Sequence, residues 1–150
     1  RRRRRILLHG RGLGPRAVIL LDTHALLWWQ AGGSRLSARA RRAIEAAETV
    51  LVSPLSFWEL GILEGKGRIR LDRDPFDWVQ DLLAQERIGT AALSPSAAML
   101  AGRLPGLGFE GDPADAMIYA TAVQERVPLV TKDQTIRLYA AERKETQTIW

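Results

Sequence analysis

The stretch AVILLD, residues 17–22, is a continuous apolar run that ends in an acid. Such a run, without polar alternation, is typical of a strand in a parallel sheet, because helices cover both faces of that kind of sheet. VLVS, residues 50–53, and PLVT, residues 128–131, have the same character. The three runs predict the central strands of a parallel sheet.

Segments with helix-start signals separate the predicted strands. Asp74-Pro75, Ser94-Pro95 and Asp112-Pro113 each pair an N-cap residue with a proline at the first helical position. The predicted helices cover residues 23–30, 38–48, 54–63, 74–88, 94–104 and 111–122, with a brief one after Asp133. Residues 91–93 and 146–150 are weaker predicted strands. The alternation predicts the α/β class, here a three-layer α/β/α fold around a central, mostly parallel sheet of about five strands.

The basic charge of the chain is concentrated at its N-terminus. The 150 residues include 22 basic and 17 acidic ones, a formal net charge of +5. Seven Arg and no acid lie in residues 1–16, so the rest of the chain is slightly acidic. We interpret residues 1–16 as a basic leader that is disordered or non-native; a basic arm that follows phosphates is the alternative. Residues 17–150 are then expected to form one domain.

Composition excludes several kinds of site. The chain has no Cys, which excludes disulfides, thiol chemistry and Cys-ligated zinc. No apolar run approaches the roughly 20 residues of a membrane-spanning helix, so we expect no membrane association. The absence of Cys also favours an intracellular, cytoplasmic location.

Four acids take positions from which they can meet at one edge of the sheet. Asp22 and Asp133 follow predicted strands, and Glu59 and Asp115 are expected in the first turns of apolar helices. Open parallel sheets form ligand sites outside the carboxyl ends of their strands. Alone, Asp22 and Asp115 are also explained as helix-start residues, Glu59 as a solvent-facing residue, and Asp133 as a turn residue. Together, the four favour a shared pocket.

Carboxylates gathered in one pocket repel one another unless a cation compensates them. An oxygen-only ligand set without Cys suits Mg²⁺ or Mn²⁺, which favour carboxylate and water. Such an ion can lower the pKa of a bound water and bind a phosphate oxygen. The acids therefore predict hydrolysis of a phosphodiester by a metal-activated water.

Each acid lies in a longer motif: LLDTHALLWW (20–29), SFWELGILEGKGRI (56–69), GDPADAMIYATA (111–122) and LVTKDQ (129–134). In order and spacing, these motifs resemble those of PIN-domain ribonucleases, and in particular the VapC-like toxins of bacterial toxin–antitoxin pairs. The resemblance covers about residues 17–150 and implies a PIN-like fold. It implies that four acids are catalytic and bind the metal: Asp22, Glu59, Asp115 and Asp133. Asp22 and Asp115 are the firmest expected ligands, Glu59 also orients the nucleophile, and Asp133 acts through water or a second ion.

The resemblance also implies supporting residues. Thr23 and Thr131 match small hydroxyl positions that hydrogen-bond the acids, and Asp112 is expected to cap its helix and support the site rather than bind the metal. Two positions depart from the family pattern. Relatives often carry Arg after the third acid, where this chain has Ala116, and many have His before the Asp-Pro pair, where Phe109-Glu110-Gly111 stands here. The acids are intact, and the basic contact to RNA is in question.

Three basic residues alternate in GKGRIR, shortly after the second motif: Lys66, Arg68 and Arg70. They are predicted to contact RNA phosphates, with a solvated turn as the alternative. His24 is interpreted as a packing or hydrogen-bonding residue, because metal-bound water removes the need for a histidine base.

Four tryptophans on apolar helices are expected in the core or at a protein interface rather than under RNA bases: Trp28, Trp29, Trp58 and Trp78. Trp28 and Trp29 cannot both face inward on one helix. One of them is therefore expected to contact a partner.

The resemblance implies a metal-dependent endoribonuclease that leaves 5′-phosphate and 3′-hydroxyl ends. It also implies a homodimer, an inhibiting cognate antitoxin and a higher toxin–antitoxin assembly. The alternative is a catalytically inactive PIN-like module that binds RNA or protein; loss of an acid would signal it, and none is lost. Haloacid-dehalogenase-like phosphatases need a second Asp where this chain has His24, and receiver domains need adjacent acids after the first strand, so both are disfavoured.

Overall fold

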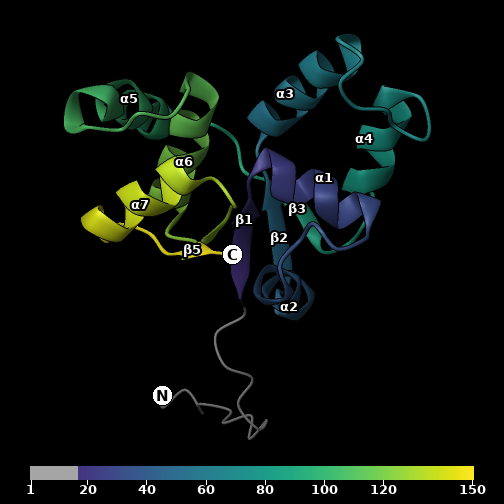
Figure 1. Cartoon of the computed structure of the whole chain (residues 1–150), viewed down its shortest axis with the longest axis horizontal. Helices are drawn as coiled ribbons and strands as arrows, with labels where there is room; N and C mark the ends of the chain where they lie inside the picture. Colours follow the sequence, from purple (N-terminus) through teal and green to yellow (C-terminus); the bar gives the residue numbers. More distant parts are fainter. Residues whose placement is uncertain (1–16) are drawn as a thin grey trace, which may run out of the picture.

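A parallel sheet of five strands organises the part of the chain that the computed structural model describes, residues 17–150 (Figure 1). The prediction for residues 1–16 lies outside the described residues. The strands are β1 (Val18–Leu21), β2 (Thr49–Val52), β3 (Ile88–Thr90), β4 (Leu129–Val130) and β5 (Thr148–Ile149). Their order is β3-β2-β1-β4-β5, and every pair is parallel. The first predicted strand is therefore the central one.

Helices cover both faces of the sheet, which confirms the predicted α/β/α layers. One face carries α1 (Thr23–Ala31), α2 (Ala38–Ala46) and α4 (Pro75–Leu83). The other carries α5 (Pro95–Arg103), the short 3₁₀ helix η1 (Leu104–Leu107), α6 (Pro113–Glu125) and α7 (Gln134–Arg143). Figure 1 shows α5, α6 and α7 together on one side of the sheet.

Alternate side chains of β1 pack into two separate hydrophobic cores, one on each face of the sheet. Ile19 and Leu21 pack with the helices of one face, and Leu20 packs with those of the other. All three are nearly or fully buried, as a strand covered on both faces requires. The helix α3 (Pro54–Gly65) lies beyond the carboxyl end of the sheet and contributes to both cores, through Leu60 and Leu55.

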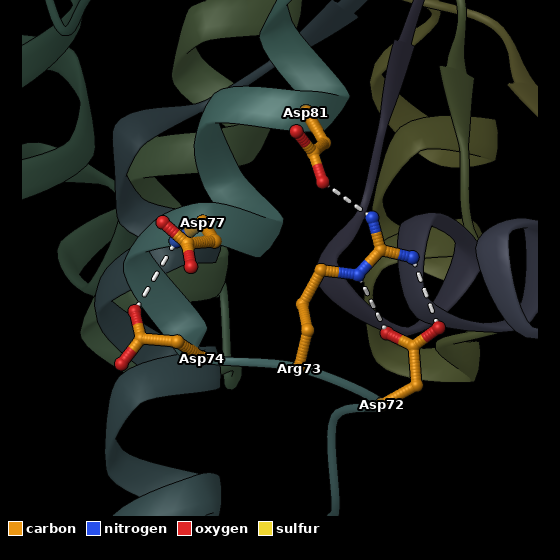
Figure 2. Close-up of polar contacts among 5 residues, drawn as sticks. All are labelled: Asp72, Arg73, Asp74, Asp77 and Asp81. Atoms are coloured by element: carbon orange, nitrogen blue, oxygen red, sulfur yellow. Dashed lines mark hydrogen bonds and ion pairs between the residues drawn. The ribbon is translucent and has the colours of Figure 1, made fainter.

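The predicted helix starts are confirmed, and α4 shows their chemistry. Asp74 is its N-cap, and one carboxylate oxygen accepts from the backbone N–H groups of Phe76 and Asp77. Figure 2 shows the bond to Asp77. The guanidinium of Arg73 donates to the carboxylates of Asp72 and Asp81. One arginine thus offsets part of the acidic charge at this exposed helix start.

The third strand is the main correction to the sequence prediction. It covers Ile88–Thr90 rather than residues 91–93, and the preceding helix ends at Leu83 rather than at residue 88. The chain turns back at Arg87, whose guanidinium donates to the Ile44 and Ala47 carbonyls at the end of α2. Pairing with β2 therefore positions a strand whose own apolar signal is only Ile88.

The helix α6 is the most enclosed one, as its apolar composition predicts. Seven of its residues are buried, and Tyr119 is among the largest fully buried side chains. None of the helices within residues 17–150 is long and apolar enough to span a membrane.

Candidate active site

A pocket of about 480 Å³ opens beside the carboxyl end of the sheet. Its lining brings together all four predicted acids with Asp112 and three other side chains: Asp22, Glu59, Asp112, Asp115, Asp133, His24, Trp28 and Lys132. We call it the acid pocket. Its residues come from the ends of β1 and β4 and from α1, α3 and the start of α6, so only the folded chain assembles it.

Asp22 forms the floor of the acid pocket. It follows β1 and is only 5% exposed. Its carboxylate caps α1 through the Thr23 N–H and also accepts from Thr131 Oγ1, 2.6 Å away. Burial raises the pKa of this carboxyl above its ordinary value, although the hydrogen bonds from Thr131 and Thr23 oppose the shift. Asp22 therefore both caps α1 and lines the acid pocket.

Glu59 enters the pocket from α3. It lies in the second turn of that helix, not the first turn expected from sequence. Thr23 Oγ1 donates to Glu59 Oε1 over 2.8 Å and lies 2.9 Å from Ser56 Oγ. Partial burial, followed by repulsion from Asp22 and Asp112, raises the pKa of Glu59. The second carboxylate oxygen of Glu59 has no hydrogen-bond partner among the described residues.

Asp112 and Asp115 occupy the start of α6. Asp112 Oδ1 accepts from the Asp115 N–H at 2.8 Å, so Asp112 caps the helix. Carboxylate oxygens of Glu59, Asp112 and Asp115 also lie within 4.8 Å of one another. Burial raises the pKa of Asp115 to about 7, and repulsion from Asp112 and the other pocket acids adds to the shift. The fold thus brings Asp112 closer to Glu59 and Asp115 than the sequence indicated.

Asp133 borders the pocket from the loop after β4. Its carboxylate caps α7 by accepting from Ile136 N–H at 2.9 Å, and its own N–H donates to Thr131 Oγ1 at 3.0 Å. Thr131 therefore links Asp133 to Asp22. Asp133 therefore both starts α7 and lines the acid pocket, so its two interpretations from the sequence do not exclude each other.

Lys132 is the pocket residue that the sequence analysis missed. Among the described residues that line the acid pocket it is the one Lys or Arg. Its Nζ lies 5.5 Å from the centroid of the Trp28 ring, which in turn contacts the rings of His24 and Trp150. Lys132 makes no ion pair with any of residues 17–150. Its place beside Asp133 in the LVTKDQ motif was the available signal.

The predicted RNA-contacting residues lie elsewhere. Lys66, Arg68 and Arg70 are exposed, and none of them lines the acid pocket. Lys66 follows Glu59 by seven residues along α3, about 10 Å of helix rise. Arg70 instead borders a polar depression with Asp72 and Trp78.

The departures from the family pattern are explained by packing. Ala116 is buried in the core beneath α6, and the ring of Phe109 stacks on Tyr119 and meets Tyr139 edge-on. A side chain at Gly111 would approach within 2.5 Å of the Phe109 ring, so glycine allows this close packing. Ala116 and Phe109 therefore pack in the hydrophobic core and carry no charge. Lys132 is the one Lys or Arg among the described residues that line the acid pocket.

The pocket residues fit a divalent cation. Oxygen ligands suit Mg²⁺ and Mn²⁺, and the carboxylates of Glu59, Asp112 and Asp115 are close enough to converge after small adjustments. Burial is the largest cause of the raised pKa of Asp115, and repulsion from the other acids, which a cation would offset, adds to it.

Comparison with known proteins places this arrangement in a family. The profile of the PIN domain matches residues 19–142. The chain belongs to the PIN-domain family. This PIN-domain chain is 41% identical over 133 residues to Ribonuclease VapC22 of Mycobacterium tuberculosis. The aligned region covers 89% of this chain and 98% of that relative.

Solved structures share the PIN fold at lower sequence identity. VapBC2 from Rickettsia felis, bound to a promoter DNA fragment, is 15% identical with a TM-score of 0.61 over 87% of this chain and 96% of that chain. VapBC-1 from nontypeable Haemophilus influenzae is 17% identical with a TM-score of 0.60, over the same shares of both chains. A toxin–antitoxin complex from Klebsiella pneumoniae is 22% identical, with a TM-score of 0.56 over 77% and 86%.

Proposed function

We propose that this PIN-domain chain is a VapC-type endoribonuclease that depends on Mg²⁺ or Mn²⁺. The observation that carries the proposal is the acid pocket, in which Asp22, Glu59, Asp115 and Asp133 meet beside one lysine. The 41% identity to Ribonuclease VapC22 supports RNA as the substrate.

Asp22, Glu59 and Asp115 are the proposed metal ligands, with Asp133 acting through water or a second ion. Asp112 joins this set because its carboxylate lies within 4.8 Å of those of Glu59 and Asp115. When bound, the cation would offset the repulsion of the acids, increase the acidity of water and draw electron density from a phosphate oxygen.

The chain's own residues prepare the reaction. The free oxygen of Glu59 is available to accept a hydrogen bond from the attacking water, while Thr23 holds the other oxygen. Thr131 holds both Asp22 and the backbone of Asp133, so the hydroxyl ties two acids to one loop. Attack on phosphorus in line with the 3′-oxygen breaks the P–O3′ bond and leaves 5′-phosphate and 3′-hydroxyl ends.

Lys132 is the proposed phosphate contact in the pocket. Its ammonium lies against Trp28 rather than on a carboxylate, so it is free to donate to a non-bridging phosphate oxygen. Lys66, Arg68 and Arg70 remain proposed contacts for RNA that extends past the pocket along α3.

The proposed partners follow from the VapC resemblance: an RNA substrate, a cognate antitoxin, a second copy of the chain and a higher toxin–antitoxin assembly. An apolar groove between α3 and α4, with Phe76 78% exposed at its edge, offers a surface that a protein partner can cover. We propose a cytoplasmic location, because the proposed substrate is cellular RNA.

The test is RNA cleavage with Mg²⁺ or Mn²⁺ by the wild type, Asp22→Asn and Asp115→Asn. We expect wild-type cleavage that chelator abolishes, and at least about a 100-fold loss in each variant, since each removes a charge that holds the cation. Equal activity in all three proteins would refute the assignment. A folded wild type without activity on any RNA would indicate the inactive PIN-like module.

A further inference from the structure

A second depression, of about 330 Å³, adjoins the acid pocket between α1, α3 and the start of α6. The two share three lining residues, His24, Glu59 and Asp112. The rest of its lining is apolar and includes Trp58 and Pro113. We call it the Trp58 depression. An acidic pocket and an apolar one thus have a common wall.

Trp58 is exposed in a way that the other helix tryptophans are not. Its side chain is 59% exposed, whereas Trp78 is buried, and Trp28 and Trp29 are half-buried. Because Trp58 precedes Glu59 on α3, the two side chains leave the helix about 100° apart. Glu59 therefore reaches the acids while Trp58 lines the neighbouring depression.

We propose that the Trp58 depression binds an unpaired nucleobase next to the scissile phosphate, with the base stacked on Trp58. The inference rests on the proposed ribonuclease function and adds to it a base-binding subsite beside the acid pocket. In a flexible RNA strand, a phosphate and the adjacent base are close enough to occupy two cavities that share a wall. A base inside a duplex is stacked and paired, so it cannot reach such a surface.

The chemistry of the depression fits a base better than a second phosphate. Its walls are largely apolar, and its described lining residues include no Lys or Arg that could hold a second phosphate. Aromatic side chains stack on every kind of base, which gives affinity with little sequence preference. The depression therefore selects for unpaired RNA rather than for one base.

The experiment compares Trp58→Ala and Trp58→Phe with the wild type on a single-stranded RNA of mapped cleavage site. Met99→Ala is the control, because Met99 is also an exposed large apolar residue but lies outside both cavities. The same RNA is made with an abasic ribose on either side of the scissile phosphate. We expect Trp58→Ala to lower kcat/KM about 10-fold or more, and Trp58→Phe and Met99→Ala to stay within about 3-fold.

The abasic substrate separates stacking from a structural role. With wild type, removal of the stacked base is expected to cost as much as Trp58→Ala, and the two changes together to cost no more than either alone. Losses that multiply, or no loss in Trp58→Ala, would overturn the proposal. A change in oligomeric state on gel filtration of Trp58→Ala would also overturn it, because Trp58 would then belong to a protein interface.

Failure of the ribonuclease function gives a different result. If wild type cleaves no RNA, fluorescence anisotropy with the same oligonucleotides in Ca²⁺ still tests the depression. Weaker binding of the abasic RNA by wild type but not by Trp58→Ala supports it. Equal binding of intact and abasic RNA by wild type, or no binding of either, overturns it.

Discussion

Around Arg73, at the exposed start of α4, the carboxylates of Asp72 and Asp81 accept hydrogen bonds from one guanidinium, whereas the acids of the acid pocket have no arginine among the described residues around them. The electrostatic results are opposite. The Arg73 hydrogen bonds lower the pKa of Asp72, while burial and mutual repulsion raise that of Asp115 to about 7. In one acidic cluster an arginine of the chain offsets part of the charge. The other has no such arginine among the described residues, an arrangement that suits the proposed cation-binding site.

The strongest test of this difference is the loss of one carboxylate from each region. Glu59→Gln is expected to reduce RNA cleavage at least about 100-fold, because it removes a metal-binding charge but keeps the acceptor for Thr23. Asp81→Asn, in the Arg73 cluster, is the control and should stay within about twofold. Initial rates at saturating Mg²⁺ check both, and equal effects would remove the distinction between the clusters.

Added metal should stabilise one region and leave the other unchanged. At about 100 times its dissociation constant, Mn²⁺ is expected to add about 2.7 kcal/mol to the free energy of unfolding, roughly 5–10 °C in Tm. Asp115→Asn should abolish most of this gain, and Asp72→Asn should keep it. Differential scanning calorimetry measures the shifts. A gain of equal size in all three proteins would place the metal elsewhere.

Lys132 lines the acid pocket and makes no ion pair with any of residues 17–150. Lys132→Met is expected to raise KM for RNA about 10-fold with little change in kcat, and Lys132→Arg should restore most of it. The dependence of binding on salt should become shallower by about one phosphate contact. Lys144→Met, at an exposed lysine outside the acid pocket, is the control. A fall in kcat alone would contradict a phosphate contact.

The two regions should also respond oppositely to pH in metal-free protein. Folded Asp115, with its pKa raised from 3.8 to about 7, keeps a proton that the unfolded chain has lost. The free energy of unfolding should therefore fall as pH rises from about 4 to about 7. Asp72 contributes the reverse, since its lowered pKa adds stability that is lost only at acid pH. Urea unfolding in chelator should show the fall, and Asp115→Asn should flatten it.

The smallest effect is expected from breaking the Arg73 cluster. Its side chains are exposed, with Arg73 at 44% and Asp72 at 71%, so water and salt screen the ion pairs. Arg73→Met should lower Tm by about 1–2 °C at low salt and less at high salt, with RNA cleavage unchanged. A large loss of stability would show that these ion pairs stabilise the fold more than screened surface pairs do.

The sequence predicted most of the fold because its signals are local. Apolar runs identified β1, β2 and β4, and Ser or Asp before proline identified helix starts. β3 was misplaced because Gly89 and Thr90 carry little apolar signal, and its position depends on pairing with β2.

The acids were predictable because each lies in or beside an element that has few other polar residues. Lys132 was not, since its contact with Trp28 depends on how α1 packs against the loop after β4. The exposure of Trp58 was also hidden, because a largely apolar helix does not show which side remains uncovered. Asp112 was predicted as a cap, and only the packing of α3 against α6 brings its carboxylate close to Glu59.

The hydrogen bond from Thr131 to Asp22 spans 109 residues of chain and fastens the first strand to the fourth. Contacts of such long range form slowly, because a large loop must close before they give any stability. On the ribosome, a nascent chain that ends between Asp115 and Leu129 already carries Asp22, Glu59 and Asp115 but lacks the strand that completes their pocket. The order of synthesis thus delays the proposed nuclease activity until β4 and Asp133 have been made.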